Sequence, residues 1–594
     1  MNQASASARI SAAIPDDALK QRFNESEIMQ RVRKLDADLS GQRPRFDHLR
    51  TQGLAPPSDC RASLTAHRDR PIIRAEGKMR WLQTTFWPAP VVLFLGVICS
   101  VRPAAAQGTA AIALPDVTGP IPVTAESYPL MASNRLQTVV DLPKLGYVEE
   151  EFFLTGRANV YDWAADGRLT VRTPGAAYTT RLLLRRPADP RRFSGNVIVE
   201  IVNSARRFDF AFTWGVSNAY FIENGDAFVV VTLAPANFEG LKAFNAARYA
   251  PLSLANPTPD EACVAGRAGG APQTATVEEG LQWDILSQVG ALLKAARPGG
   301  PMAGFTVQRA YMTAYSGELT TYIAAIHPNA RLANGRPVYD GYIQHRHPAL
   351  VRIRRCAPAP AANDPRQILR NVDVPIIRIV GQTDVLATYA QRREDSDAPG
   401  DRYRLYEIAG GAHADAAFYP YMPSVADLKK AGSAFPFLAF WPFANQCEPE
   451  MSFSRTPINT VALNAAYANL TRWVRDGAAP PKAQRIQVEN GGTPQARVVL
   501  DMFGNAGGGV RTPYLDVPIA TYYTSTKGET FCPELARTEP FTWTRLASLY
   551  GTPQNYAAKV AQSVDRLVRE RWLTESDGRK IKAESGLVGG PSTH

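Results

Sequence analysis

The 594-residue chain has few cysteines and few histidines for its length. Of its six cysteines, Cys263, Cys356, Cys447 and Cys532 follow residue 107, and no two cysteines are spaced as C-x-x-C. The sequence therefore lacks the usual motifs of structural zinc sites and of thioredoxin-type redox sites. It also lacks the G-x-x-x-x-G-K-[ST] loop that cradles nucleotide phosphates. We therefore expect neither a cofactor nor a metal ion.

The net charge of +11 comes largely from the first part of the chain. Residues 1–106 contain 16 basic and 10 acidic residues, which leaves a net charge of +5 for residues 107–594. Such a mild excess, without a basic and aromatic motif beside it, does not indicate a nucleic-acid partner. The share of hydrophobic residues, 45%, is ordinary for a globular protein. The length predicts one large domain with additions, or two to three domains.

The apolar run from Ala89 to Val101 is too short to span a bilayer, which takes about 20 residues. It follows the basic Lys78-Met79-Arg80 and precedes the small residues Ala104-Ala105-Ala106. This three-part layout is typical of a secretory signal peptide, here residues 79–106. A membrane anchor is the alternative if the segment is not cleaved.

A signal peptide normally lies at the very N-terminus, so we expect translation to start at Met79. Residues 1–78 are then either disordered or an extension outside the mature protein. The mature chain is expected to be periplasmic or secreted. In that oxidising compartment its four cysteines should form one or two disulfides, with Cys447–Cys532 as the first pairing. Buried free thiols are the alternative.

Short apolar runs alternate with helical stretches through the central region. This pattern predicts an α/β fold with a mainly parallel sheet and helices on both faces. The predicted strands are 197–202, 227–233, 310–313, 338–343, 374–380 and 403–408. The predicted helices are 278–296, 319–326, 458–475 and 556–572. Two further strands, 170–172 and 178–184, are expected to form an antiparallel edge around a Pro-Gly turn.

The pattern also suggests where the domains divide. The predicted helix 458–475 ends before Gly477 and Pro480-Pro481, which stop helices. We therefore assign residues 107–484 to the α/β domain and residues 485–594 to a C-terminal extension packed on it. An aromatic-rich insertion at 415–457 is expected either to wall the acyl pocket or to form a second hydrophobic cluster.

The scarcity of histidine narrows the search for a general base. His327, His345, His347, His413 and His594 are the histidines after residue 107. His413 follows a predicted strand and a glycine turn, which delivers an imidazole to the carboxyl edge of the sheet. A structural turn residue is the alternative for His413. The H-x-H pair of His345 and His347 could instead bind a metal ion, although no carboxylate lies at a familiar spacing beside it.

An acid and a nucleophile follow two other predicted strands. Asp384 lies just after strand 374–380, where its carboxylate can hold the second imidazole nitrogen of His413. An Asx-turn residue is the alternative for Asp384, and Asp340 is the competing acid. Ser316 lies between strand 310–313 and helix 319–326, and this strand-turn-helix lifts its hydroxyl above the sheet. A nucleophile on such a strand-turn-helix is expected to precede its acid and then its base along the chain, and Ser316, Asp384 and His413 come in that order.

Six stretches of the chain carry a family resemblance. They are Gly146–Phe153, Val199–Asn203, Arg248–Leu252, Tyr322–Pro328, Asp340–Tyr342 and Gly508–Pro513. Over most of residues 130–585 the chain resembles a family of large bacterial secreted proteins called α/β-hydrolase domain-containing proteins. The resemblance implies an α/β-hydrolase sheet with Ser316, Asp384 and His413 as a catalytic triad. It also implies oxyanion donors at the amide of Gly317 and in the turn around Asn203 and Ser204.

The nucleophile turn departs from the family pattern. Members typically carry a longer turn of the form G-x-S-Q-S-G, whereas Ala314-Tyr315-Ser316-Gly317-Glu318 is about three residues shorter. Glu318 stands where a small residue normally relieves the strained turn, and its carboxylate would oppose an oxyanion. An alignment without a gap would place Thr313 at the nucleophile position, but a residue inside the strand would point poorly. Ser316 remains the predicted nucleophile.

The sequence therefore predicts a serine hydrolase that cleaves a carboxylic ester or related acyl bond of a small molecule through an acyl-enzyme intermediate. A non-catalytic binding protein on the same fold is the alternative, because a fold does not determine a function. A metallohydrolase that uses His345 and His347 is a third interpretation. No pattern in the sequence indicates an oligomeric state.

We predict that the mature protein begins at Gln107. Signal peptidase cleaves after small residues, and Ala104-Ala105-Ala106 provides them. Mass spectrometry of the exported protein should find Gln107 as the first residue. Membrane-held protein that begins at or before Met79 would contradict this prediction.

Overall fold

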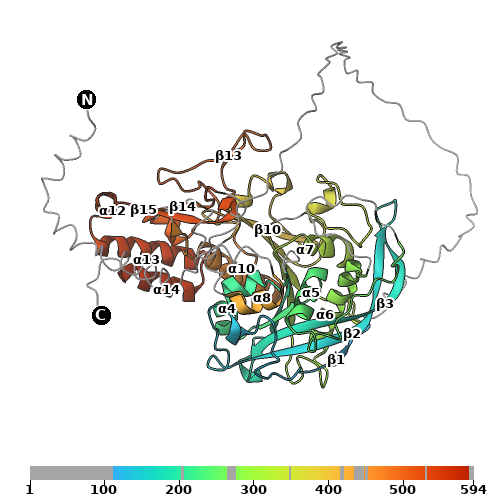
Figure 1. Ribbon diagram of the computed structural model, residues 1–594. Helices are drawn as coiled ribbons and strands as arrows, with labels where there is room; N and C mark the ends of the chain where they lie inside the picture. Colours follow the sequence, from blue (N-terminus) through green and yellow to red (C-terminus); the bar gives the residue numbers. More distant parts are fainter. Residues whose placement is uncertain are drawn as a thin grey trace, which may run out of the picture. The chain divides into compact units, whose positions relative to one another are not determined.

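A ten-stranded sheet forms the centre of the protein (Figure 1). The computed structural model describes residues 112–202, 207–261, 263, 276–346, 349–414, 421–433, 447, 452–528 and 532–587. The predicted extension 1–78 and signal peptide 79–106 lie outside the described residues. So do residues 415–420, 434–446 and 448–451 of the predicted insertion.

Six parallel strands make up the middle of the sheet. In spatial order they are β5 (Ala227–Val231), β4 (Asn196–Ile201), β6 (Arg309–Ala314), β7 (Gly341–His345), β8 (Ile376–Gly381) and β10 (Asp401–Ile408). Every residue of β4, β5 and β8 is buried. Strands covered on both faces read as continuous apolar runs, which is why the sequence locates them well. The predicted mainly parallel sheet is confirmed.

Antiparallel strands extend the sheet at both edges. They are β1 (Asp116–Thr118), β2 (Tyr147–Trp163) and β3 (Leu169–Pro187) beside β5, and β9 (Ser396–Ala398) beside β10. Figure 1 shows β2 and β3 as two long neighbouring arrows.

The Pro-Gly turn predicted inside the antiparallel edge is wrong, because β3 runs through Pro174-Gly175 without a break. Opposite Pro174-Gly175, the pairing of β3 with β2 shifts register between Ala158 and Val160 of β2. Side chains of β2 bond the backbone of Gly175: Asn159 Oδ1 accepts from its N–H at 3.0 Å, and Arg157 donates to its carbonyl at 2.8 Å. These bonds support the backbone next to Pro174, which has no N–H to donate.

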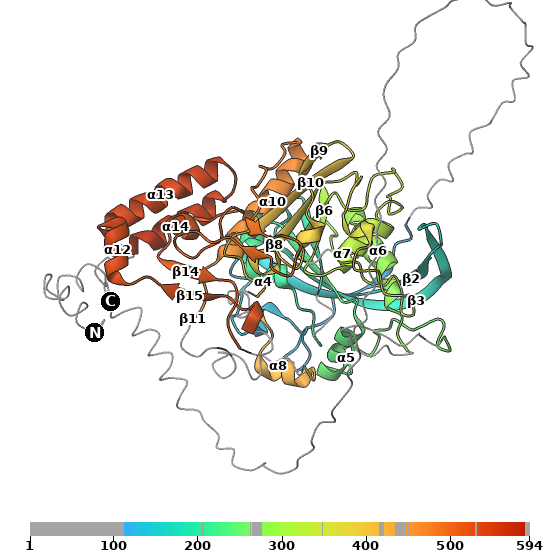
Figure 2. The same cartoon turned by 90° about the horizontal axis from the view of Figure 1, so that it is seen from above.

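Helices cover both faces of the sheet, as predicted. On one face, α4 (Phe212–Asn224) and α10 (Ile458–Asp476) contact each other and the strands beneath them. On the other face lie α6 (Gln282–Ala295) and α7 (Glu318–Thr321), and α7 continues as a π-helical turn through Tyr322–Ile326. Figures 1 and 2 show the two helix pairs on opposite sides of the strands. None of the helices in the described ranges is long and apolar enough to cross a membrane.

Shorter elements complete the structure. Helices α5 (Pro235–Phe244) and α8 (Val425–Lys430) contact each other. The C-terminal residues form a three-stranded antiparallel sheet of β11 (Ser452–Phe453), β15 (Arg537–Pro540) and β14 (Ala520–Tyr523), and a pair of β12 (Val488–Glu489) with β13 (Arg497–Val498). The C-terminal helices are α11 (Pro513–Asp516), α12 (Trp543–Tyr550), α13 (Pro553–Arg569) and α14 (Glu575–Leu587). Figure 2 shows α13 and α14 side by side.

The C-terminal helices have a hydrophobic cluster of their own, which includes Leu546, Val560, Val564 and Leu567. Val461 of α10 also belongs to this cluster, so α10 packs on the sheet with one side and on the C-terminal helices with another. We call residues 485–587 the C-terminal layer.

Two disulfides link distant parts of the chain. One joins Cys263 to Cys356, and the other joins Cys447 to Cys532. The second is the pairing that the sequence analysis placed first. It attaches a residue of the predicted insertion to the C-terminal layer, and such a long loop closure restricts the unfolded chain.

A buried network of ions joins β2 and β3 to the chain before α4. Arg181 forms ion pairs with Glu151 and Asp209, and Arg248 forms one with the same Glu151. The side chains of all four residues are at most 1% exposed where these pairs form. Tyr249 also donates to Glu151 at 3.0 Å. Buried charges persist only when paired and hydrogen-bonded, and this network meets both conditions.

We predict that Glu151→Gln lowers the free energy of unfolding by about 3–5 kcal/mol, because it leaves two buried guanidinium groups without their shared charge. Urea unfolding followed by circular dichroism measures this loss. Asp166→Asn is the control: it breaks an ion pair with Arg168 that is 50% exposed at Asp166 and 83% exposed at Arg168. It should change stability by no more than about 0.5 kcal/mol. Equal effects of both substitutions would contradict the proposed importance of the network.

Candidate active site

The carboxyl ends of β6, β7, β8 and β10 meet at one edge of the sheet. Each strand is followed there by a polar residue: Ser316 after β6, Arg346 after β7, Asp384 after β8 and His413 after β10. Parallel strands bring their carboxyl ends to the same edge, which is where α/β sheets place their ligand sites. The three residues predicted as a triad therefore lie at one edge.

Asp384 and His413 are joined by a hydrogen bond. Asp384 ends a short 3-10 helix, Gln382–Asp384, and its Oδ1 lies 2.7 Å from His413 Nδ1. The backbone N–H of His413 donates to Thr383 Oγ1 at 3.1 Å, which fixes the imidazole next to this helix. A carboxylate at Nδ1 favours the tautomer with its proton on that nitrogen. Nε2 is then the nitrogen that can accept a proton.

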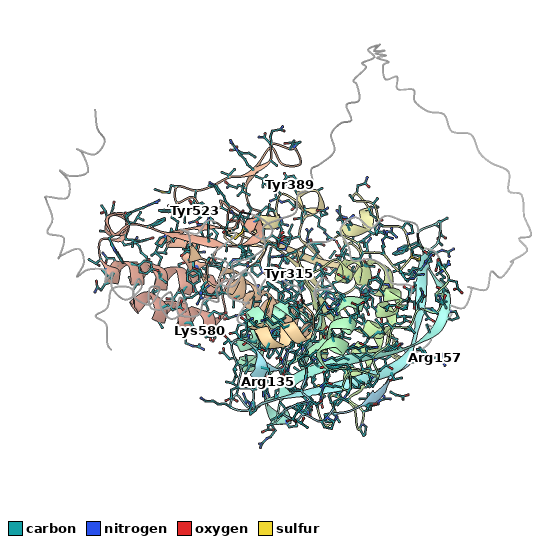
Figure 3. All side chains as sticks on the ribbon, in the orientation of Figure 1. Arg135, Arg157, Tyr315, Tyr389, Tyr523 and Lys580 are labelled. Atoms are coloured by element: carbon teal, nitrogen blue, oxygen red, sulfur yellow. A yellow bond between two sulfur atoms is a disulfide. The ribbon has the colours of Figure 1, made fainter. Side chains whose placement is uncertain are left out.

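Tyr315 lies beside His413 and was not among the site residues predicted from the sequence. Its ring stacks on Phe212 at 3.9 Å, and the guanidinium of Arg346 lies 3.8 Å from its centre. Its hydroxyl donates to the backbone carbonyl of His413. Figure 3 labels Tyr315. The signal in the sequence was its position directly after β6 and directly before Ser316.

Ser316 lies in the same turn, but its hydroxyl is not hydrogen-bonded to His413. Among the described residues, its buried Oγ has no hydrogen-bond partner. Its backbone carbonyl accepts from Gln344 at 2.9 Å. The next residue has to be glycine, because a Cβ on Gly317 would lie 2.0 Å from the carbonyl oxygen of Ala349. Glu318 follows as the first residue of α7.

Glu534 contacts the other side of the imidazole. Its Oε2 lies 3.4 Å from His413 Nε2, and it belongs to the 3-10 helix Cys532–Glu534 of the C-terminal layer. Nothing in the sequence pattern connects Glu534 with His413, because they come together only when the C-terminal layer packs beside the sheet. The backbone N–H of Ala414 donates to the carbonyl of Glu534 at 2.8 Å, which fixes this arrangement.

The charges around His413 act in opposite directions. Burial of the imidazole and the nearby guanidinium of Arg346 lower the pKa of His413, whereas the carboxylates of Asp384 and Glu534 oppose that change. The net effect is a pKa below the ordinary value, so His413 is mostly neutral at pH 7. A neutral imidazole is the form that accepts a proton in general-base catalysis.

The space among these side chains is small. The cavity lined by Phe212, Tyr315 and Arg346 holds about 20 Å³, room for a single water molecule. The side chain of His413 is 25% exposed. The side chains of Ser316, Asp384 and His413 do not line this cavity.

The competing candidates lie elsewhere. Asp340 as the acid is wrong, because it accepts from the N–H of Ala310 at the start of β6 and pairs with Lys294, at the opposite edge of the sheet. Thr313 is fully buried and bonds Tyr467 at 2.9 Å and His345 at 3.1 Å, so its hydroxyl points into the core.

The metal alternative depends on residues that are only partly described. Burial lowers the pKa of His345 to about 3, and its Nε2 bonds Thr313. His347 lies outside the described residues, as do the predicted oxyanion residues Asn203 and Ser204. Within the described part of the chain, no three histidine, cysteine, aspartate or glutamate side chains are grouped to hold a metal ion.

We predict that Tyr315→Phe lowers the free energy of unfolding by about 1 kcal/mol, because it removes the hydrogen bond to the His413 carbonyl. Urea unfolding measures the change. Tyr523, labelled in Figure 3, provides a matched control. Tyr523→Phe removes an exposed hydrogen bond of 2.9 Å to Glu539 and should change stability less. If Tyr523→Phe cost as much as Tyr315→Phe, the bond to His413 would not be significant.

The match to one family model agrees with this architecture. Residues 117–583 match the model of a family described as alpha/beta hydrolase domain. No curated protein sequence matches the chain. Similar solved structures include a thermostable esterase from Pseudomonas putida ECU1011, with 11% identity, 50% of this chain and 82% of that chain covered, and a TM-score of 0.26. Another is esterase B from Lactobacillus rhamnosis, with 12% identity, 44% and 74% covered, and a TM-score of 0.21.

The family match, which extends over most of the chain, confirms the inferred resemblance to α/β-hydrolase domain proteins. It includes the sheet, the Asp384–His413 pair and nearly all of the C-terminal layer. The chain belongs to this family of α/β-hydrolase domain proteins.

Proposed function

We propose that this protein hydrolyses a carboxylic ester or a related acyl bond of a small molecule through an acyl-enzyme intermediate on Ser316. The observation that carries the proposal is the 2.7 Å hydrogen bond between His413 Nδ1 and Asp384 Oδ1 at the carboxyl edge of the sheet. It leaves Nε2 to act as a general base. Membership of the α/β-hydrolase domain family supports hydrolase activity in general.

The proposed reaction has two halves. Ser316 Oγ attacks the acyl carbon while His413 Nε2 takes the hydroxyl proton, and that proton then passes to the oxygen of the departing alcohol. Water, activated in the same way, hydrolyses the acyl-serine and restores the enzyme. Asp384 stays ionised and stabilises the imidazolium that forms in each half. The amide of Gly317 and the turn around Asn203 and Ser204 are the proposed oxyanion donors.

The environment of Ser316 supports its role as the nucleophile. Burying a hydroxyl without a hydrogen-bond partner costs about 1–3 kcal/mol, so an unpaired Oγ needs a reason to persist. Catalytic use is one such reason. Ser316 follows Tyr315, whose hydroxyl is bonded to His413, so the nucleophile and the base belong to contiguous parts of one site. Thr313, the other hydroxyl considered, is already bonded in the core.

A non-catalytic binding protein is the second candidate, and one observation favours it. Glu534 lies 3.4 Å from His413 Nε2, the atom that has to take the proton of Ser316. If Glu534 never leaves that position, the imidazole has no access to the nucleophile. The fold itself does not decide between the two functions.

We also propose that the protein acts outside the cytoplasm. The disulfides Cys263–Cys356 and Cys447–Cys532 support export, because such bonds persist mainly in oxidising compartments.

We predict that a fluorophosphonate probe labels the native protein at Ser316. Ser316→Ala should abolish labelling, and Asp384→Asn should slow turnover of p-nitrophenyl esters by about 10⁴-fold, because the imidazole loses its oriented tautomer. His413→Ala should suppress labelling as well. Mass spectrometry of the labelled peptide and initial-rate kinetics provide the measurements.

Thr313→Ala is the control for these variants and should still be labelled. Failure of the native chain to react with the probe or with any activated ester would contradict the hydrolase proposal and leave the binding protein as the function. Labelling that survives Ser316→Ala but not Thr313→Ala would reassign the nucleophile.

A further inference from the structure

The imidazole of His413 lies between two carboxylates from distant parts of the chain. Asp384 Oδ1 is 2.7 Å from Nδ1, and Glu534 Oε2 is 3.4 Å from Nε2. The first carboxylate belongs to the turn after β8, which the order of the strands brings to this edge. The second belongs to the C-terminal layer. The proposed reaction uses Asp384 but gives no role to Glu534.

The backbone of Glu534 is held against the residue that follows His413. The N–H of Ala414 donates to the Glu534 carbonyl at 2.8 Å, and Ala536 donates to the Ala414 carbonyl at 3.4 Å. The disulfide to Cys447 holds Cys532, two residues before Glu534. The side chain of Glu534 itself is 39% exposed, so its carboxylate can turn into solvent without a movement of the backbone.

The contact depends on whether the imidazole carries a second proton. With Nδ1–H directed at Asp384, a neutral imidazole presents the lone pair of Nε2 to the Glu534 carboxylate, and two acceptors then face each other. When Nε2 is protonated, it donates to Glu534 and the contact becomes a charge-assisted hydrogen bond. The structure thus contains a contact that favours the form of His413 that cannot accept the proton of Ser316.

We propose that Glu534 is a positioning residue that acts through His413: it binds the imidazole when acidic pH protonates it, and it releases Nε2 to Ser316 when the imidazole is neutral. The C-terminal layer would in this way determine the pH range in which the base is available. The proposal rests on the proposed hydrolase function for its consequence in catalysis. The contact between Glu534 and His413 can be tested without turnover.

The charged groups around His413 determine whether the loss of Glu534 raises or lowers the pKa of the imidazole. In the described part of the chain, Arg346, Asp384 and Glu534 are the charged side chains that act on the imidazole. Arg346 and burial lower the pKa of His413, and Asp384 and Glu534 raise it. The Tyr315 hydroxyl is bonded to the His413 carbonyl and does not occupy Nε2. Removing the charge of Glu534 should therefore lower the pKa of His413 further.

The decisive experiment compares Glu534→Gln with Glu539→Gln in the full mature protein. Both variants remove one negative charge from the C-terminal layer, but Glu539 is an exposed residue of β15 bonded to Tyr523. Imidazole resonances followed by NMR between pH 4 and 9, assigned with His413→Asn, report the titration of His413 directly. We expect the titration of His413 to move to lower pH in Glu534→Gln and to remain at the native value in Glu539→Gln.

The same variants give a second measurement by their pH profiles. Hydrolysis requires neutral His413, so kcat/KM rises as the pH increases through its pKa. For Glu534→Gln this rise should occur at lower pH, with several-fold faster hydrolysis on the acidic side than the native protein shows. Glu534→Ala should behave in the same way, since it also removes the carboxylate. Glu539→Gln should keep the native profile.

A His413 titration that is the same in the native protein, Glu534→Gln and Glu539→Gln would overturn the inference. A uniform loss of activity at every pH, together with an unchanged titration, would also overturn it, because that is the behaviour of a structural residue. Failure of the native protein to label or to hydrolyse esters contradicts the proposed function instead. The titration still decides whether Glu534 controls His413 in that case.

Discussion

The close approach of the ends of β8 and β10 is the constraint on which the site depends. A Cβ at Gly381, the last residue of β8, would lie 2.9 Å from the carbonyl oxygen of Gly411 and 3.1 Å from that of Ala412. Only glycine at position 381 allows the segments that follow β8 and β10 to leave the sheet so close to each other. That proximity permits the hydrogen bond from His413 to Thr383 and the pairing of its imidazole with Asp384. A larger residue at 381 would push the segment that carries His413 away from Asp384.

The short turn after β6 determines what stands next to this pair. Gly317 packs directly against the carbonyl of Ala349, so α7 begins close to the segment that follows β7 and leaves little freedom to the residues before it. Tyr315 fills the space between Phe212 and Arg346 and holds the His413 carbonyl. The Oγ atom of Ser316 is left buried and without a hydrogen-bond partner among the described residues. Hydrogen bonds therefore fix Asp384 and His413, whereas the short turn after β6 places Ser316 beside them.

The C-terminal layer affects the site as well as the stability of the fold. It shares α10 with the sheet through Val461, and it is linked to Cys447 by the disulfide at Cys532. Its Glu534 reaches the imidazole that the sheet presents. The charge state of His413 consequently depends on Arg346, Asp384 and Glu534, which follow β7, β8 and β14. A change in the packing of the C-terminal layer would therefore alter the pKa of His413, which belongs to another part of the chain.

The sequence by itself determined the parallel strands, the helices α6, α7, α10 and α13, and the positions of Ser316, Asp384 and His413 after three of those strands. These features depend on local apolar runs and on residues that follow them directly, which a linear pattern contains. The Pro-Gly turn was wrong because side chains of the neighbouring strand support the backbone at Gly175. Asp340 was wrong as an acid because it lies at the amino end of β7, beside the start of β6. The contacts of Tyr315 and Glu534 with His413 were decided only by tertiary structure, because they join side chains that are far apart in the chain and whose positions depend on packing between layers.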